Sequence, residues 1–361
     1  FSRLAGLQIR SLGISLILFA VCVYYFGEKR LESLTRKRYI YGIVSIALIT
    51  LTALVGKEVN GRKLFLDLGV MNFQTVELVK VFALLFMTGY FRYEMAFIES
   101  GKNLLNIPRM RYLMPYLVMW VLILLPIFLQ KDLGPTALIF LLFIAVFYLG
   151  TGSWVSVAAG FIAMAGAGTA AYVSGFPSMV RTRVDMWLDP FHYSQNMAEA
   201  LWAVSGGGWF GRGTGLGLSH RIPVVQSDFN VAALAEEWGF IGLFCVFWTL
   251  CLLGGRVVIL ASRSRRPYLQ MFITGFALLW IFQTLIIACG NTGLLPLTGI
   301  TFPFVSYGGS SLLINFLILG VVVRFSHDLA PVGPAPGVNR GHHTDPGAGL
   351  ILNSTLERSL A

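Results

Sequence analysis

The stretch YIYGIVSIALITLTALV, residues 39–55, contains no charged residue and is apolar on every side of a helix. Crossing the hydrocarbon core of a bilayer takes about 20 mainly apolar residues. Similar runs recur along the chain of 361 residues, of which 56% are hydrophobic and 12% charged, against about 25% charged in an average soluble domain. A transmembrane β-barrel would instead show short strands of alternating polarity. The sequence therefore predicts an all-α polytopic membrane protein.

Apolar windows of this kind predict about nine transmembrane helices and one large extracytoplasmic loop. The expected limits of the spans are 5–26, 39–56, 74–91, 112–129, 136–150, 154–174, 231–254, 269–289 and 307–325. The loop, about residues 175–228, separates the sixth span from the seventh. We assign residues 1–326 to one transmembrane domain. The tail 327–361 is rich in Pro, Gly and polar residues, so we expect it to be disordered and cytoplasmic.

The distribution of Lys and Arg orients these spans. The loops 27–38, 92–111 and 255–268 carry thirteen basic residues, whereas the short loops of the opposite side carry four. Because basic residues accumulate in cytoplasmic loops, the first set is cytoplasmic and the segment 175–228 is extracytoplasmic. This topology also accounts for the net charge of +10 with anionic lipid as the partner, so a nucleic acid is not expected.

Charged residues inside a span are candidates for function, because each costs about 2.5 to 3.5 kcal/mol at the centre of the bilayer on insertion scales. Gln74, Glu77 and Lys80 recur every three residues, which places them on one stripe of a helix. Glu77 and Lys80 are then close enough to pair. A structural ion pair and a role in handling a substrate or ion explain this stripe equally well.

The extracytoplasmic segments hold further candidates. Asp132 follows the fourth span and suits a solvated turn as well as a site. Asp228 precedes the seventh span, where it could cap the helix or act chemically. Glu236 and Glu237 could complement the dipole of that helix. Guanidinium groups bind diphosphates well, and the arginines that suggest an anionic lipid ligand are Arg181, Arg183, Arg212 and Arg221.

The glycine-rich stretch 206–217 contains the pattern GxGxxG. No strand precedes it and no βαβ unit surrounds it, so a nucleotide site is disfavoured. Glycines here favour a close approach of the backbone to other helices or to a ligand. The spacing of the cysteines and histidines indicates no dedicated metal site.

Read in order, these elements resemble the SEDS family, named for shape, elongation, division and sporulation. The strongest match is residues 291–311, NTGLLPLTGITFPFVSYGGSS, which is similar to the family's N-x-G-x-x-P-x-T-G-I-x-x-P-F-x-S-Y-G-G-S-S. Weaker matches to T-D-F, E-E-x-G-F-I-G, Q-P-S-E-x-x-K and P-D-L-G are residues 227–229, 236–242, 74–80 and 132–134. The likeness extends to about Phe325. Family members have ten spans, and we expect that this chain lacks the first.

The resemblance implies a glycosyltransferase of the bacterial cytoplasmic membrane. Such an enzyme polymerises lipid II, the undecaprenyl-diphosphate-linked disaccharide pentapeptide, into peptidoglycan strands on the extracytoplasmic face. Attack on the side opposite an α-linked diphosphate gives a β-1,4 bond with inversion, which needs one base and no covalent intermediate. By its position and its match to the family motif, Asp228 is the candidate base.

The other candidates would line or brace the substrate cavity. Glu77 and Lys80, with Gln74 and Asp132, would lie beneath the base, and the four arginines would steady the leaving diphosphate. The matched motifs add Glu236, Glu237, Ser306, Tyr307, Gly308, Gly309, Ser310 and Ser311. A divalent cation could share the work of the arginines, although no ligand cluster in the sequence demands one.

Two other functions remain open. A lipid II flippase or transporter would be expected to show pseudo-symmetric halves, and the sequence has no internal repeat. A non-catalytic scaffold for a transpeptidase would not need Asp228. The resemblance also implies a partner, a monofunctional class B penicillin-binding transpeptidase, together with other machinery of cell-wall elongation or division. The sequence does not separate these two duties, although an elongation role is slightly preferred.

Overall fold

The computed structural model describes residues 2–59, 62–67, 69, 72–100 and 110–329. Within these residues, a long helix occupies the position of every predicted span. These helices are α1 (Ser2–Tyr25), α3 (Arg38–Val55), α4 (Thr75–Ser100), α5 (Met110–Leu129), α6 (Leu133–Thr151), α7 (Trp154–Ser174), α11 (Asn230–Ser262), α12 (Pro267–Asn291) and α13 (Gly309–Leu329). The predicted all-α polytopic fold is confirmed.

Eight of these helices are long and apolar enough to cross a membrane, counted over the described residues. The long helix outside this set is α4, which carries Glu77, Lys80, Arg92 and Glu94. It packs against α3, α5, α6 and α12, and side chains such as Leu84 are fully buried there. Protein therefore surrounds much of α4, which makes its charges tolerable at the third predicted span.

Short elements fill the connections. The helices are α2 (Glu28–Thr35), α8 (Ser178–Leu188), α9 (Pro190–Tyr193) and α10 (Gln195–Gly207), with a 3₁₀ turn η1 (Ser219–Arg221). Three strands, β1 (Lys57–Val59), β2 (Arg62–Asp67) and β3 (Asn72–Gln74), form a small antiparallel sheet in the order β1-β2-β3. The large predicted loop is thus mostly helical.

Several helix ends differ from the predicted limits, since α4 continues to Ser100 and α11 to Ser262, and two of the differences affect other predictions. Gln74 pairs with Phe65 in the sheet, and α4 begins one residue later, so the prediction that Gln74 shares a helical stripe with Glu77 and Lys80 is wrong. At the other end, α13 continues to Leu329. Residues 327–329 of the predicted tail are therefore helical, and the remainder, 330–361, lies outside the described residues.

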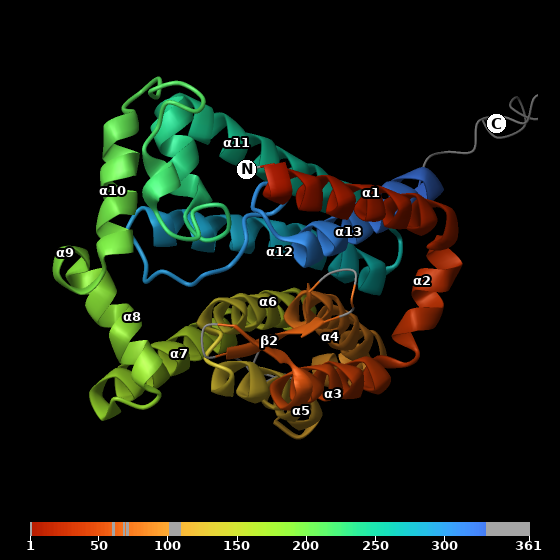
Figure 1. Cartoon of the computed structure of the whole chain (residues 1–361). Coiled ribbons are helices and arrows are strands. Elements are labelled where there is room, and N and C mark those ends of the chain that lie inside the picture. The colour runs from red at the N-terminus through yellow and green to blue at the C-terminus, as the bar shows by residue number, and fades with distance from the viewer. Residues whose placement is uncertain (1, 60–61, 68, 70–71, 101–109, 330–361) are drawn as a thin grey trace, which may run out of the picture. The chain divides into compact units, whose positions relative to one another are not determined.

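Helix packing joins distant parts of the sequence. α1 lies along α13, and α3 lies along α4 (Figure 1). α12 packs against α11 and also contacts α4 and α6. Large side chains fill the core between these helices, and Trp280, Tyr90 and Tyr116 are fully buried. α12 thereby brings the region after residue 291 next to the charged part of α4.

α11 is broken at Gly239, whose φ of 69° is not helical. The break frees backbone groups that a continuous helix would pair, and the loop 208–213 binds four of them. The bonds run from Arg212 N to Glu236 O, Gly213 N to Glu237 O, Phe240 N to Gly208 O and Ile241 N to Trp209 O. A Cβ at Gly207 or Gly211 would collide with the backbone of α11. The glycine-rich stretch therefore serves close backbone approach, one of the two roles predicted for it.

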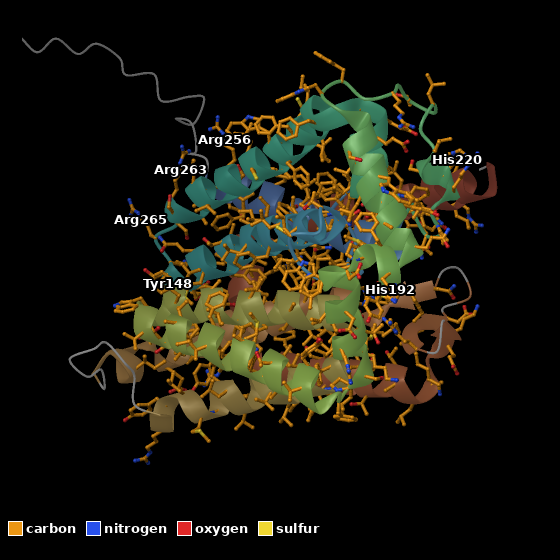
Figure 2. The ribbon with its side chains drawn as sticks, turned by 90° about the vertical axis from the view of Figure 1, so that its left-hand side faces the viewer. Tyr148, His192, His220, Arg256, Arg263 and Arg265 are labelled. Carbon is orange, nitrogen blue, oxygen red and sulfur yellow. The ribbon has the colours of Figure 1, made fainter. Side chains whose placement is uncertain are left out.

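Basic residues gather at one end of the helices, and the large loop lies at the other. Figure 2 shows Arg256, Arg263 and Arg265 together at one side, and His192 and His220 of the segment 175–228 at the other. The basic residues in the last part of α11 and in its connection to α12 are thus far from the large loop along the helix direction. This separation is what the positive-inside reading requires.

Candidate active site

Asp228 lies in the turn that leads into α11. Its amide donates to the carbonyl oxygen of Val224 at 3.1 Å. The N-cap position of α11 is Phe229, and the side chain that accepts from a first-turn amide, that of Ala232, belongs to Asn291. Capping, one of the two sequence-based interpretations of Asp228, therefore finds no support in the structure, and its half-buried carboxyl is available for another role.

The segment 291–311 holds this turn from both sides. Asn291 Nδ2 donates to the carbonyl oxygen of Asp228 at 2.9 Å. Ser306 Oγ accepts from Asn230 Nδ2 at 2.7 Å and donates to the carbonyl oxygen of Ser227 at 3.0 Å. The amide of Tyr307 donates to the carbonyl oxygen of Gln226 at 2.8 Å. The backbone around Asp228 is thereby fixed by the motif that carries the strongest resemblance.

Arg183 reaches the same place from α8. A Cβ built on Gly299 would lie 3.5 Å from Asp228 Oδ2 and 3.8 Å from Arg183 Nη2. The carboxylate and the guanidinium group therefore face one spot that the glycine leaves free of side-chain atoms. Gly299 has a φ of +70°, a conformation that favours glycine.

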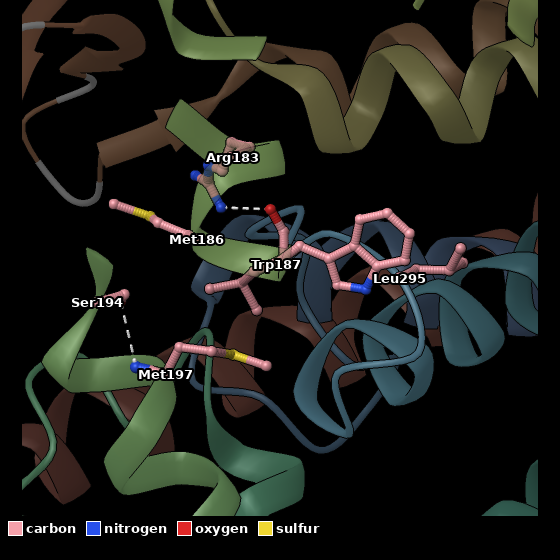
Figure 3. A pocket seen from close by; sticks show the side chains of 7 residues that line it. Arg183, Met186, Trp187, Ser194, Met197 and Leu295 are labelled. Atoms are coloured by element: carbon pink, nitrogen blue, oxygen red, sulfur yellow. Dashed lines mark hydrogen bonds between the residues drawn. The ribbon is translucent and has the colours of Figure 1, made fainter. Parts of the chain in front are cut away.

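α8 is tied to the segment that contains Gly299. Arg183 Nη1 donates to the carbonyl oxygen of Leu297, and Figure 3 shows the Arg183 side chain with this bond dashed. One turn further along, Trp187 Nε1 donates to the carbonyl oxygen of Gly293 at 2.8 Å. These bonds fix the guanidinium group at the edge of a small, mostly apolar pocket.

Asp132 approaches from the turn between α5 and α6. Only 5% of this residue is exposed, and among the described residues its Oδ2 has no hydrogen-bond partner. A Cβ on Gly134 would lie 2.7 Å from the carbonyl oxygen of Thr298. The turn that carries Asp132 thus packs on Thr298. The next residue is Gly299, and it is the vacant side-chain position of Gly299 that faces Asp228.

Burial and neighbouring charges shift the titration of this cluster. Burial raises the pKa of Asp132 to about 7, against the attraction of Arg62 and Arg183. Burial also raises the pKa of Asp228, which a hydrogen bond from Ser227 and the same two arginines partly offset. Burial lowers the pKa of Arg183, as does Arg62. Asp132, Asp228, Arg62 and Arg183 therefore form one electrostatic unit, named here the acid–arginine cluster.

Glu77 and Lys80 pair as predicted, with 2.8 Å between Oε2 and Nζ, and both residues are 5% exposed. Lys80 Nζ also donates to Gln283 Oε1 at 3.3 Å. Gln283 Nε2 in turn donates to the carbonyl oxygen of Thr301 at 2.7 Å. A polar chain thus runs from α4 through α12 to the segment 291–311.

The hydroxyl-bearing motif residues hold the backbone together. Ser311 Oγ accepts from Thr301 Oγ1 at 2.8 Å. Ser310 Oγ accepts from the amide of Gln74 at 2.9 Å and donates to the carbonyl oxygen of Asn72 at 3.2 Å. Gly309 begins α13, and Gly308 precedes it with its carbonyl oxygen accepting from the amide of Leu312 at 2.9 Å. A direct role of these residues toward a substrate stays a prediction.

Several predicted candidates lie in a second group. Arg212 pairs with the buried Glu236 at 3.1 Å, and Glu236 Oε2 accepts from the amide of Ser219 at 2.7 Å. Arg212, Arg221 and Glu236 line a cavity of about 260 Å³ beside α10. Glu237 follows Glu236 in α11, where its carbonyl oxygen binds the loop 208–213.

Arg181 lies apart from both groups. It is largely exposed on α8 and lies 4.0 Å from Asp185, one turn away.

Arg62 and Gln283 were not among the predicted site residues. Arg62 could have been found from its position, because it lies in a predicted extracytoplasmic loop and positive-inside topology places few basic residues there. The signal for Gln283 was a side-chain amide in the middle of an apolar span.

The fold and the acid–arginine cluster define a multi-pass membrane protein with a charged site among its helices. The chain belongs to the FtsW/RodA/SpoVE family of cell cycle proteins, whose model matches residues 3–330. The predicted resemblance to the SEDS family is thereby confirmed.

Named relatives are similar over most of the chain. The peptidoglycan glycosyltransferase RodA of Mycobacterium tuberculosis (strain H37Rv) is 33% identical over 323 residues, which cover 86% of this chain and 67% of the relative. A probable peptidoglycan glycosyltransferase FtsW of Thiomicrospira cyclica is 29% identical and covers 94% of this chain and 84% of its own length.

A solved structure shares the fold. A chain from a study of how a peptidoglycan synthase complex coordinates polymerisation and crosslinking matches with a TM-score of 0.74 and 27% identity. The match covers 91% of this chain and 90% of that one.

Proposed function

We propose that the chain is a peptidoglycan glycosyltransferase that polymerises lipid II into β-1,4 glycan strands, with Asp228 as the general base. The observation that carries this proposal is the shared spot beside Gly299, which the carboxylate of Asp228 and the guanidinium group of Arg183 both face. The curated names of the relatives support the reaction class. A scaffold would need neither group at this place.

In the proposed reaction, the carboxylate and the arginines have separate tasks. Asp228 takes the proton of the acceptor's 4-hydroxyl while that oxygen forms the new bond to the donor's anomeric carbon. The bond from this carbon to the diphosphate breaks, and the diphosphate leaves with the electron pair. Arg183 and Arg62 stabilise the charge that develops on it. Burial raises the pKa of Asp228, which makes it a stronger base than an exposed aspartate.

Asp132 and the polar chain support these two groups. The polar chain from Glu77 to Thr301 braces the segment that carries Gly299. A divalent cation would find a ligand in the Oδ2 of Asp132, which has no hydrogen-bond partner in the described part of the chain, because Mg²⁺ is commonly held by one or two carboxylates together with phosphate groups of the substrate. Such an ion would add positive charge beside the diphosphate.

The charge distribution supports a location for the site. We place the acid–arginine cluster on the extracytoplasmic face of the bacterial cytoplasmic membrane, opposite the basic residues of Figure 2. The proposed partner is a monofunctional class B penicillin-binding transpeptidase, with other elongation or division machinery. The solved relative comes from a study of a complex that joins polymerisation to crosslinking, which supports a partner of this kind.

Purified protein in lipid nanodiscs, incubated with labelled lipid II, tests the proposal. We expect glycan ladders, and more product when the transpeptidase is present. Folded protein that makes no polymer in either case would contradict it. Transfer of lipid II across vesicles without polymer would favour a flippase.

A further inference from the structure

The cavity beside α10 lies apart from the acid–arginine cluster. Its lining includes Glu199 and Trp202 of α10 and Arg221 of η1, whereas the arginines that act on Asp228 are Arg183 and Arg62. We propose that this cavity is a non-catalytic saccharide site that holds a sugar unit of the growing glycan strand. The inference rests on the proposed function, since that reaction supplies such a strand.

Trp202 supplies a flat apolar surface at the cavity. It is 61% exposed, and its ring contacts Phe191 with 6.0 Å between centroids. The neighbouring face of α10 is buried in a small core through Met197, Ala200 and Ala203. Core packing therefore does not account for the tryptophan. An exposed indole offers an apolar face and a polar N–H, which match the C–H face and the hydroxyls of a pyranose ring.

The charges around the cavity are balanced. Arg212 and Arg221 are matched by Glu199 and Glu236. Hydroxyl groups both donate and accept, so guanidinium and carboxylate groups together suit a sugar. A diphosphate would favour an excess of positive charge.

The floor of the cavity is rigid. Glu236 is tied to Arg212 at 3.1 Å and to the amide of Ser219 at 2.7 Å. The volume of about 260 Å³ falls just below the range of roughly 300 to 1,000 Å³ for small-molecule sites, so it fits a sugar unit and not a protein domain.

The cavity is connected to the proposed base by packing. Ala203 and Ile222, which line it, share a small core with Phe229, the residue that follows Asp228. The segment that carries Asp228 and the lining of the cavity therefore pack against one another, and in the proposal the strand passes from one to the other. Holding the product there would keep it bound between successive additions and lengthen the strand.

Binding of a sugar without lipid or diphosphate tests the site directly. The probe is an unlipidated GlcNAc–MurNAc tetrasaccharide, titrated calorimetrically into the purified full chain in nanodiscs. We expect binding that weakens at least tenfold in Trp202→Ala and in Arg221→Ala. Matched controls are Trp209→Ala, a similarly exposed tryptophan (66%) outside the cavity lining, and Arg256→Ala at the opposite side of the view in Figure 2. Both controls should bind like the wild type.

Product length gives a second readout. Trp202→Ala should shorten the glycan strands several-fold at an unchanged initial rate of lipid II consumption, with melting temperature as the folding control. No tetrasaccharide binding by the wild type, or equal loss in Trp209→Ala, would overturn the inference. Loss of transpeptidase binding alone in the two cavity variants would do so as well, since it would make the cavity a protein-docking surface. Tetrasaccharide binding by a wild type that makes no polymer would instead refute the proposed function.

Discussion

The side chain of Asn291 binds the backbone of Asp228, with 2.9 Å between Nδ2 and the carbonyl oxygen. Its Oδ1 also accepts from the amide of Ala232 at 3.4 Å. One buried amide group at the end of α12 therefore fixes both the proposed base and the first turn of α11. Asn291 is a positioning residue, because it acts on the reaction through Asp228.

Replacing Asn291 by Ala should lower kcat with little change in KM. The carbonyl oxygen of Asp228 loses a buried partner, a loss that costs about 1 to 3 kcal/mol. Initial rates over a range of lipid II concentrations, with thermal unfolding in parallel, measure both effects. Asn291→Asp keeps an acceptor for Ala232 but cannot donate, so its kcat should also fall. Normal kcat in both variants would contradict the positioning role.

Replacing Asp228 by Asn should abolish polymerisation while lipid II binding persists. The amide cannot accept a proton, and a positioned base contributes roughly 10² to 10⁴ in rate. The measurement combines the glycan ladder with binding of labelled lipid II in nanodiscs. Ser227→Ala is the matched neighbour and should retain most activity. Polymer at the wild-type rate in Asp228→Asn would remove this residue from the mechanism.

The pH dependence of polymerisation should show an acidic limb above the ordinary range of an aspartate. Asp228 is active only when ionised, and its pKa is raised chiefly by burial. The rate should therefore fall as the pH drops through a value above about 3.9, the usual pKa of aspartic acid. The profile of kcat/KM against pH measures it. A rate unchanged well below that value would exclude a carboxylate base.

Asp132 should make the protein less stable at high pH. Its pKa is raised from 3.8 to about 7, so between these values the folded state binds more protons than the unfolded state. Stability therefore falls as the pH rises through this window. Asp132→Asn should remove the fall, and its melting temperature relative to wild type should increase from pH 5 to pH 8. A constant difference across this range would contradict the shifted pKa.

Replacing one partner of the α4 ion pair should lower the stability of the protein more than replacing both partners. Glu77→Gln leaves Lys80 charged and buried, and losing one partner of a buried pair costs about 3 to 5 kcal/mol. The double variant Glu77→Gln with Lys80→Gln should recover part of that stability. Melting temperatures of the single and double variants form the cycle. Additive losses would mean that the two residues are not coupled.

The long helices were predictable because bilayer-spanning segments carry a strong and continuous signal. The predicted spans 39–56 and 154–174 match α3 and α7 within a residue. The helices α8 to α10 were not predicted, because the segment 175–228 mixes polar and apolar residues. The broken α11 was not predicted either, since Gly239 reads as one more small residue in an apolar run.

The pair of Glu77 and Lys80 was predictable because both residues lie three positions apart on one helix. The acid–arginine cluster was not, because Arg62, Asp132, Arg183 and Asp228 come from four separate segments. Only tertiary packing brings them together. The family resemblance selected Asp228 and Asp132 but gave no reason to include Arg62.

The break at Gly239 is repaired by main-chain bonds to residues 208–213. These bonds join peptide groups, so they do not depend on the chemical type of the side chains in the loop. They require only that no side chain stands between the loop and α11. The side chains of Trp209 and Phe210 are exposed, so charged or small residues there would leave the main-chain bonds intact. One extra methyl group at Gly207 or Gly211 would instead push the loop away from α11. Homologous chains should therefore vary widely at positions 209 and 210 and should almost always keep glycine at positions 207 and 211.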